Sequence, residues 1–411
     1  MSEPGFRRFG EDLSPTFSLY VQDIELQQDV TRYIKSVEFE STIEMADLID
    51  LTILNPNFAV SHEKNWLNYK GFAEGNEAEL WMGYGRADHF IGRAIFQKHF
   101  PMFPAEDIPT LKVKGYDKSF LMMDASGPLK GAKENKIKLV EQSPKDKKDN
   151  QGKSWVELKH STVVEQVARK YAMHPDIDAT TKVDTMVQKK GMKDYDLVKT
   201  LANLNQREFW VDYRQAHGWT LHWKKSNDTA SPVYDFKYNA GAATTLLTLE
   251  PEYGIQGAIT NLLVLAWSEQ REEWVSVVEL ENVEGENPIF KKGQSGKKGS
   301  NSAILNETLE SANQFRFSAA GVAIDIISNH QFKDLDSLAR FARGWFLDQK
   351  DNFMIVKGTV VGVETLLSRQ VHNLTGTGCK RIDGPFYFIV VRHKQSDGGY
   401  VCEFTARKII E

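Results

Sequence analysis

The residues that could carry catalysis or bind a metal are scattered along the chain. No HExxH sequence and no closely spaced pair of cysteines occurs, so the usual spacings of a zinc site are missing. The two cysteines, Cys379 and Cys402, could pair, but two thiols do not make a disulfide framework and suit a reducing cytosol. A lone histidine is more often a core or surface residue than a ligand. The histidines weighed on this basis are His160, His174, His217, His222, His330, His372 and His393.

Paired carboxylates and glycine-rich turns are equally weak signals here. Glu272 and Glu273 are adjacent, so on a strand they point to opposite faces, whereas Glu307 and Glu310 could share a helical face but have no base or nucleophile motif beside them. Residues 83–92, GYGRADHFIG, contain Gly-x-Gly, but the next glycine is too distant for a dinucleotide fingerprint, and no Walker A sequence occurs. The sequence therefore predicts no catalytic residues, no cofactor and no metal site.

A group of aromatic residues offers a different chemistry, because such rings can stack on a sugar or a nucleobase. They alternate beside a leucine-striped helix, so packing inside a small module explains them as well and is the favoured interpretation. The group consists of Phe209, Trp210, Tyr213, Trp219 and Trp223.

Composition limits the class of protein. The chain has 411 residues, of which 41% are apolar and 26% charged, and its formal net charge is −5. These values describe a globular protein of more than one domain and do not favour a strongly basic nucleic-acid binder. The first fifteen residues show no apolar signal segment, and no stretch reaches the roughly 18 apolar residues of a membrane span.

The fold that positions these residues is predicted to be of the α+β class, with mainly β structure. Short alternating runs predict strands through 15–123, and lysine-rich residues 126–154 then read as a charged linker. Residues 155–232 predict a small α+β module, in which a helix begins near Ser161 or Thr162 as N-cap and a second, carrying Leu197, Leu201 and Leu204, leads into two strands. Residues 233–411 return to strands, with an insertion at about 266–334 and a helix over 334–349. We expect 130–153 and 284–302, rich in Lys or Gly, to be mobile before assembly.

An internal repeat links the two β-rich regions. Gly83 and Gly85 recur as Gly376 and Gly378, and a later glycine, Gly92 or Gly384, opens an apolar strand in each copy. Each strand runs to a histidine, His99 or His393, and a second strand follows. The segments 83–119 and 376–408 therefore predict two copies of one β-domain, although shared hairpin rules are an alternative explanation.

The order of several motifs resembles the late-control protein D family. These are baseplate hub proteins of contractile-tailed phages, related to the hub part of type VI secretion spike proteins. The resemblance covers roughly 15–250 and 335–408, whereas 130–153 and 284–302 have no counterpart and no spike or lysozyme-like segment follows residue 411. The motifs are LWMGYG, VKGYDKSFLMM, DLVKTLANLNQREFWVDY, TLHW, LTLEPEYG and IDGPFYFIVVRHKQSDGGYVCEFTARK.

The resemblance implies a specific architecture and role. Residues 1–125 and 233–411 would be two tail-tube-like β-barrel domains, and a homotrimer would form a pseudo-sixfold ring joining a hexameric tail tube to a trimeric spike. A channel would let DNA and the tape measure protein pass without specific binding. The implied partners are the tube or tube-initiator protein, the central spike and baseplate wedge proteins, in a virion assembled in the host cytoplasm.

The closing hairpin, 392–408, would then be tube wall. One of its faces carries Tyr400, Cys402, Phe404 and Ala406, and the other carries Val401, Glu403 and Thr405. Two alternative functions remain, a tail-associated peptidoglycan hydrolase and a carbohydrate-binding adhesin. The hydrolase needs a catalytic pair in 255–335, and the adhesin needs exposed tryptophans.

Overall fold

In a computed structural model the chain divides into two compact units. The first comprises residues 1–202, 207–250 and 357–406, and the second comprises 203–206, 251–356 and 407–411. The structure describes residues 14–43, 45–56, 65–86, 89–123, 153–181, 183–188, 191–253, 261–268, 273–280, 322–326 and 354–409.

The N-terminal part of the first unit is a run of antiparallel strands, called here the first half of the sheet. In β7 the pattern alternates strictly, so Leu111 and Val113 are buried while Lys112 and Lys114 point away from the core. The elements are β1 Pro15–Val21, β2 Ile24–Glu25, α1 Gln28–Thr31, β3 Ile34–Thr42, β4 Leu48–Leu54, β5 Glu77–Tyr84, β6 His89–Met102 and β7 Thr110–Tyr116, with 3-10 turns at Trp66–Asn68, Lys70–Phe72 and Lys118–Met123.

Two helices and five short strands follow β7 and its 3-10 turn, and they are called here the small module. Both predicted helices form, and β11 pairs with β12 in the predicted hairpin. The predicted N-cap is wrong: Lys159 caps α2 without a side-chain bond, and Ser161 lies inside the helix, where its Oγ accepts from the backbone N of Thr180 at 3.1 Å. The elements are β8 Lys153–Lys159, α2 His160–Lys170, β9 His174–Ile177, β10 Val183–Gln188, α3 Asp194–Leu204, β11 Glu208–Arg214 and β12 Gly218–Lys224.

The remaining strands of the main sheet come from the C-terminal part of the chain and form its second half. The closing hairpin is β20 and β21, and its inward-facing side chains Tyr400, Cys402, Phe404 and Ala406 are buried. The elements are β13 Asp235–Lys237, a 3-10 turn at Gly241–Ala243, β14 Leu246–Tyr253, β18 Met354–Val361, β19 Val371–Thr375, β20 Gly384–Ser396 and β21 Gly399–Lys408.

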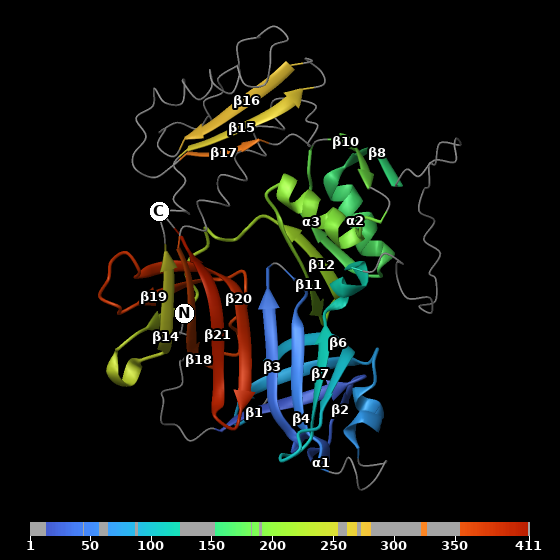
Figure 1. The fold of residues 1–411 in the computed structure, drawn as a ribbon, viewed down its shortest axis with the longest axis vertical. Helices are drawn as coiled ribbons and strands as arrows, with labels where there is room; N and C mark the ends of the chain where they lie inside the picture. The colour runs from blue at the N-terminus through green and yellow to red at the C-terminus, as the bar shows by residue number, and fades with distance from the viewer. Residues whose placement is uncertain are drawn as a thin grey trace. The chain divides into compact units, whose positions relative to one another are not determined.

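The two halves share one 13-stranded sheet, because β20 pairs antiparallel with β3 (Figure 1). The strand order in the first half is β5-β6-β7-β4-β3, and in the second half it is β19-β20-β21-β18-β14. When the strands of each half are numbered from first to fifth along the chain, both halves have the order 3-4-5-2-1. The connection that differs most in length between the halves joins the first two strands, and it is 43–47 in one half and 254–353 in the other.

Backbone hydrogen bonds fix which residues of the two halves match. Phe96 donates to the carbonyl of Asn76 at 2.9 Å, and Phe388 donates to that of Gln370 at 2.9 Å. Counted from these phenylalanines, Gly92 matches Gly384, as the sequence repeat predicts. His99 matches Val391, so the alignment of His99 with His393 in the sequence is two positions out of structural register.

The described part of the second unit contains a three-stranded sheet in the order β16-β15-β17. Its strands are β15 Asn261–Ser268, β16 Glu273–Leu280 and β17 Val322–Ile326. The segments 130–152 and 284–302 and the predicted helix over 334–349 lie outside the described residues. No helix in the described part of the chain is long and apolar enough to cross a membrane.

Candidate functional site

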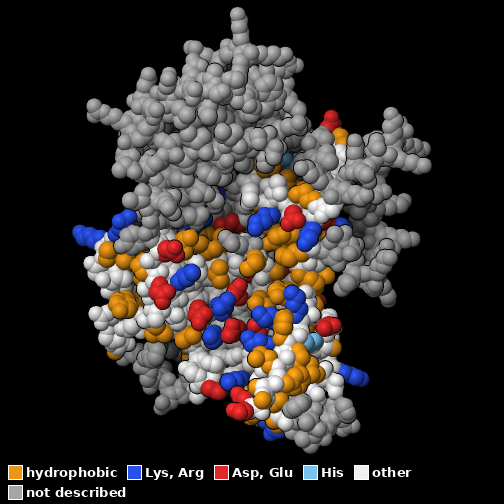
Figure 2. Space-filling view, in the orientation of Figure 1, with side chains coloured by type: hydrophobic (Ala, Val, Ile, Leu, Met, Phe, Trp, Pro, Cys, Tyr) orange, Lys and Arg blue, Asp and Glu red, His pale blue; other side chains and the backbone are white. Residues whose placement is uncertain are grey.

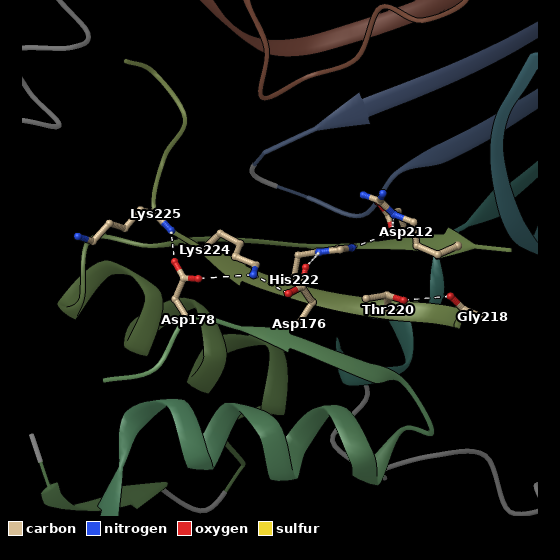
Figure 3. Close-up of polar contacts among 9 residues, drawn as sticks. Asp176, Asp178, Asp212, Gly218, Thr220, His222, Lys224 and Lys225 are labelled. Carbon is tan, nitrogen blue, oxygen red and sulfur yellow. Dashed lines mark hydrogen bonds and ion pairs between the residues drawn. The ribbon is translucent and has the colours of Figure 1, made fainter. Parts of the chain in front are cut away.

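A histidine held between two carboxylates is the group most suggestive of chemistry (Figure 3). His222 of β12 lies beside Asp176 of β9 and Asp212 of β11, with Nδ1 2.8 Å from Asp176 Oδ2 and Nε2 2.9 Å from Asp212 Oδ1. Both ring nitrogens are therefore engaged by carboxylate oxygens. The ring is buried, and neither nitrogen is left to move a proton to a substrate.

Basic neighbours complete this cluster and keep its carboxylates ionised. Lys224 Nζ lies 2.5 Å from Asp176 and 3.5 Å from Asp178, and Arg214 lies 2.9 Å from Asp212. Burial acts to raise the pKa of Asp212, but hydrogen bonds from His222 and Arg214 and their charges lower it to about 2. The same balance, with Lys224 and His222 as donors, lowers the pKa of Asp176. The cluster therefore ties three strands together and is poorly suited to general acid catalysis.

The aromatic group of the module is mostly packed. Trp223, Trp219 and Phe209 are 0%, 6% and 9% exposed. Trp210 stacks on the His222 ring at 4.7 Å, and the Arg369 guanidinium lies 4.7 Å from the centre of the Trp210 ring. This arrangement favours the packing interpretation over a platform for sugars.

A thiol–imidazole pair lies in the closing hairpin, where the sequence gave no motif to find it. Cys402 Sγ is 3.5 Å from His393 Nδ1, which also bonds Tyr400 Oη at 2.6 Å, while Nε2 bonds the carbonyl of Leu366 at 2.6 Å. Burial raises the pKa of Cys402 to about 12 and lowers that of His393 to about 4. Thiolate is the nucleophile, so this buried pair is not an activated one.

Two buried carboxyl groups lie where the β3–β4 turn approaches the 3-10 turn after β7. The backbone N of Asp47 donates to Asp117 Oδ2 at 2.6 Å, and Asp47 Oδ1 accepts from the backbone N of Thr42 at 3.0 Å. Burial raises the pKa of both carboxyls, although the nearby Arg369 guanidinium acts in the opposite direction. Arg369 also donates to the carbonyl of Thr42 at 2.8 Å, which joins the second half of the sheet to this turn.

The remaining histidines do not come together. His174 and His217 stack on each other with ring centres 4.4 Å apart, and burial lowers the pKa of His372 to about 3. His160 begins α2. Among the described residues no group of three His, Cys, Asp or Glu side chains could hold a metal ion. Glu272, Glu307, Glu310 and His330 lie outside the described residues, and the side chain of Glu273 is not described.

The junction between β20 and β3 is the feature with the clearest architectural role. The strands pair from Val390 opposite Thr42 to Ser396 opposite Ser36. On the outward face Arg392 is ion-paired with Glu40, and Lys394 Nζ lies 3.9 Å from Glu38 and 3.8 Å from Glu403. Figure 2 shows acidic and basic side chains intermingled across this face.

The small module is attached to both halves of the sheet. Tyr387 Oη donates to Glu208 at 2.6 Å, and Trp219 Nε1 donates to Glu77 at 3.2 Å. Arg93, ion-paired with Glu77 at 2.8 Å, lies 4.2 Å from the centre of the Tyr213 ring. These contacts join the small module to both halves of the sheet.

Solved structures share this fold, whereas no protein-family model and no curated protein matches the sequence. A tail protein from Neisseria meningitidis MC58 is 12% identical with a TM-score of 0.63, over 96% of this chain and 97% of that chain. The 43 kDa tail protein of prophage MuSo2 from Shewanella oneidensis is 11% identical with a TM-score of 0.61, over 96% and 98%. An Escherichia coli type VI secretion component, described as structurally similar to T4 tail proteins, is 10% identical with a TM-score of 0.52, over 96% and 77%.

The chain thus has the fold of phage and prophage tail proteins. A type VI secretion component shares the same fold. The resemblance to baseplate hub proteins inferred from the sequence motifs is confirmed at the level of the fold.

Proposed function

We propose that the protein is the structural hub of a contractile-tail baseplate, located in the virion. Three copies form a pseudo-sixfold ring that joins the hexameric tail tube to the trimeric spike. The observation that carries this proposal is the repeated strand order, since one chain then supplies two similar positions to a ring. The fold shared with tail proteins supports it.

The outward face of the β20–β3 junction suits the wall of a channel. Its cations are already matched by carboxylates: Arg392 by Glu40, and Lys394 by Glu38 and Glu403. Binding to DNA depends on cations that neutralise phosphates and release counterions. A wall with paired charges lets DNA and the tape measure protein pass without specific binding.

The hub acts by structure, without catalysis. In the part of the chain that the structure describes, Cys402 and His393 are buried and His222 is held between two carboxylates. Its partners are a tube or tube-initiator protein, the central spike and wedge proteins. The adhesin alternative loses support because Trp219 and Trp223 are buried.

Copy number in the assembled tail tests the proposal. Quantitative mass spectrometry of purified tails carrying this chain should give three copies per tail, against a tube protein present in multiples of six. Negative-stain images of the tail tip should show a ring with threefold symmetry. Six copies per tail, or absence of the chain from the tip, would overturn the proposal.

A further inference from the structure

Arg369 occupies a backbone position that the equivalent turn of the first half gives to a glycine. Arg369 N donates to the carbonyl of Phe388 at 2.8 Å, and Gly75 N donates to that of Phe96 at 2.8 Å, so the two residues match. Both have a left-handed backbone, with φ of 68° at Arg369 and 89° at Gly75. Glycine adopts this conformation freely, whereas a residue with a Cβ atom is disfavoured there. An arginine at this place therefore points to a role for its side chain.

The side chain of Arg369 contacts two other regions of the molecule. Its Nη1 donates to the carbonyl of Thr42 at 2.8 Å and its Nη2 to Ser41 Oγ at 3.1 Å, both in β3 of the first half. The preceding residue adds to this anchor, because Ser368 Oγ lies 2.7 Å from Ser41 Oγ. The Arg369 guanidinium also lies 4.7 Å from the centre of the Trp210 ring, in β11 of the small module. A guanidinium over an indole is attracted to the face of the ring.

The charge of Arg369 lies where carboxyl groups of the sheet and of the module come together. Burial raises the pKa of Asp47, the Arg369 charge acts to lower it, and the charges of Asp117 and Asp212 add to the rise. Asp47 and Asp117 belong to turns of the first half, whereas Asp212 is in β11 of the module. Arg369 therefore offsets repulsion between carboxyl groups on the two sides of this boundary.

The small module shares no strand pairing with the main sheet in the part of the chain that the structure describes. Its strands form the separate sheets β11-β12-β9 and β10-β8. Side chains make the attachments instead, such as Glu208 with Tyr387 and Trp219 with Glu77. A boundary of this kind can open while the strand pairs on both sides stay intact.

We propose that Arg369 is a latch that fixes the small module to the two halves of the sheet, and that the module separates from the sheet as a folded unit when the latch is removed. The proposal concerns a single chain and does not depend on the proposed function. Ser41 and Thr42 hold the guanidinium in place, and Trp210 is the part of the module on which it acts. The orientation of the module is then set by one residue of the second half.

Modification of a tryptophan on the other side of the module tests the latch in the full chain. Trp219 is 6% exposed and bonds Glu77 of the first half, whereas Trp223 is 0% exposed and reports on the module's own fold. N-bromosuccinimide modifies accessible indoles, and peptide mass spectrometry gives the rate at each tryptophan. Arg369→Gly removes the side chain and installs the residue that the backbone favours. We expect the rate at Trp219 to rise by about tenfold, the size expected for losing a cation–ring contact and its hydrogen bonds, and the rate at Trp223 to stay unchanged.

The matched control is Arg32→Gly, which removes another guanidinium that lies over a ring, 5.0 Å from the centre of Tyr33 in the first half. Its rates at Trp219 and Trp223 should equal those of the unchanged chain. An unchanged rate at Trp219 in Arg369→Gly would show that the module is held without the latch. Equal rises at Trp219 and Trp223 would show that the module unfolds rather than separates. Either result would overturn the proposal.

A second variant decides the matter if circular dichroism shows that Arg369→Gly does not fold. Trp210→Leu leaves the guanidinium on Ser41 and Thr42 and removes the ring beneath it. It should raise the rate at Trp219 by a smaller factor and leave the rate at Trp223 unchanged. In that case an unchanged rate at Trp219, or failure of Trp210→Leu to fold as well, overturns the proposal.

Discussion

The two halves of the sheet have the same strand order, yet only one of them is completed inside the chain. β3 of the first half is paired on both sides, by β4 and β20, whereas β14 of the second half has β18 alone among the described strands. The difference shows that repeating a strand order does not repeat the environment of each strand: β3 is an interior strand of the sheet, whereas β14 ends it.

The largest effect should come from truncating the matched core phenylalanines. Phe388 and Phe96 are both fully buried, so Phe388→Ala and Phe96→Ala should each lower the free energy of unfolding by about 3–5 kcal/mol. Because one sheet contains both, each variant should shift the same denaturant transition, measured by circular dichroism. Two separate transitions, each sensitive to one variant, would show that the halves unfold independently.

Acid should destabilise the second half of the sheet through His393, which is more deeply buried than His99 in the first half. Burial lowers the pKa of His393 from 6.5 to about 4, so the unfolded chain binds more protons in this interval. Its contribution is fully present above pH 6.5 and is lost as the pH falls through about 4, by on the order of 2–3 kcal/mol.

His393→Asn should flatten that part of the stability–pH curve, measured by urea unfolding at a series of pH values. The matched control is His99→Asn in the first half, where the ring is 21% exposed. If the free energy of unfolding of His393→Asn still falls between pH 6.5 and about 4 as it does in the unchanged chain, the loss does not come from His393.

The first half should respond to pH with the opposite sign. Burial raises the pKa of Asp47 above its ordinary 3.8, so its contribution is fully present below that value and is lost as the pH rises through the raised pKa. Asp47→Asn keeps the acceptor for the backbone N of Thr42 and should remove this loss, measured as a smaller decrease of the free energy of unfolding between acid and neutral pH. Asp107→Asn, at an exposed residue, is the control, and equal slopes in the two variants would disprove the prediction.

The smallest effects come from two exposed cations of the sheet. Arg392→Met removes an ion pair with Glu40 inside one chain, and because Arg392 is 42% exposed the expected cost is below about 1 kcal/mol at any protein concentration. Lys98→Met, at an exposed residue of β6 in the same sheet, should cost still less. Urea unfolding of both variants measures the difference, and a larger loss in Lys98→Met would argue against this order.

Local patterns in the sequence predicted local structure well. The stripe of Leu197 and Leu201 predicted α3, and its continuation into Phe209 and Val211 predicted β11, because both signals depend on neighbours a few residues apart. The glycine repeat predicted that two regions share a topology, and Gly92 and Gly384 do match. The histidine at the end of each copy gave a wrong alignment. Counted from Phe96 and Phe388, His99 and His393 lie two positions apart.

Long-range pairing could not be read from the sequence. His222, Asp176 and Asp212 meet only because β9 pairs parallel with β12 and β11 antiparallel with it, and nothing in the local sequence encodes those registers.

The connection between β14 and β18 gives the chain an evolutionary freedom that its other turns lack. In the first half the corresponding strands are joined by residues 43–47, and in the second by residues 254–353, yet both pairs occupy the same place in the sheet. Closing the longer loop costs only about 2–3 kcal/mol more entropy than closing the shorter one. The sheet therefore accommodates an insertion of this length between its first two strands without a change in strand order.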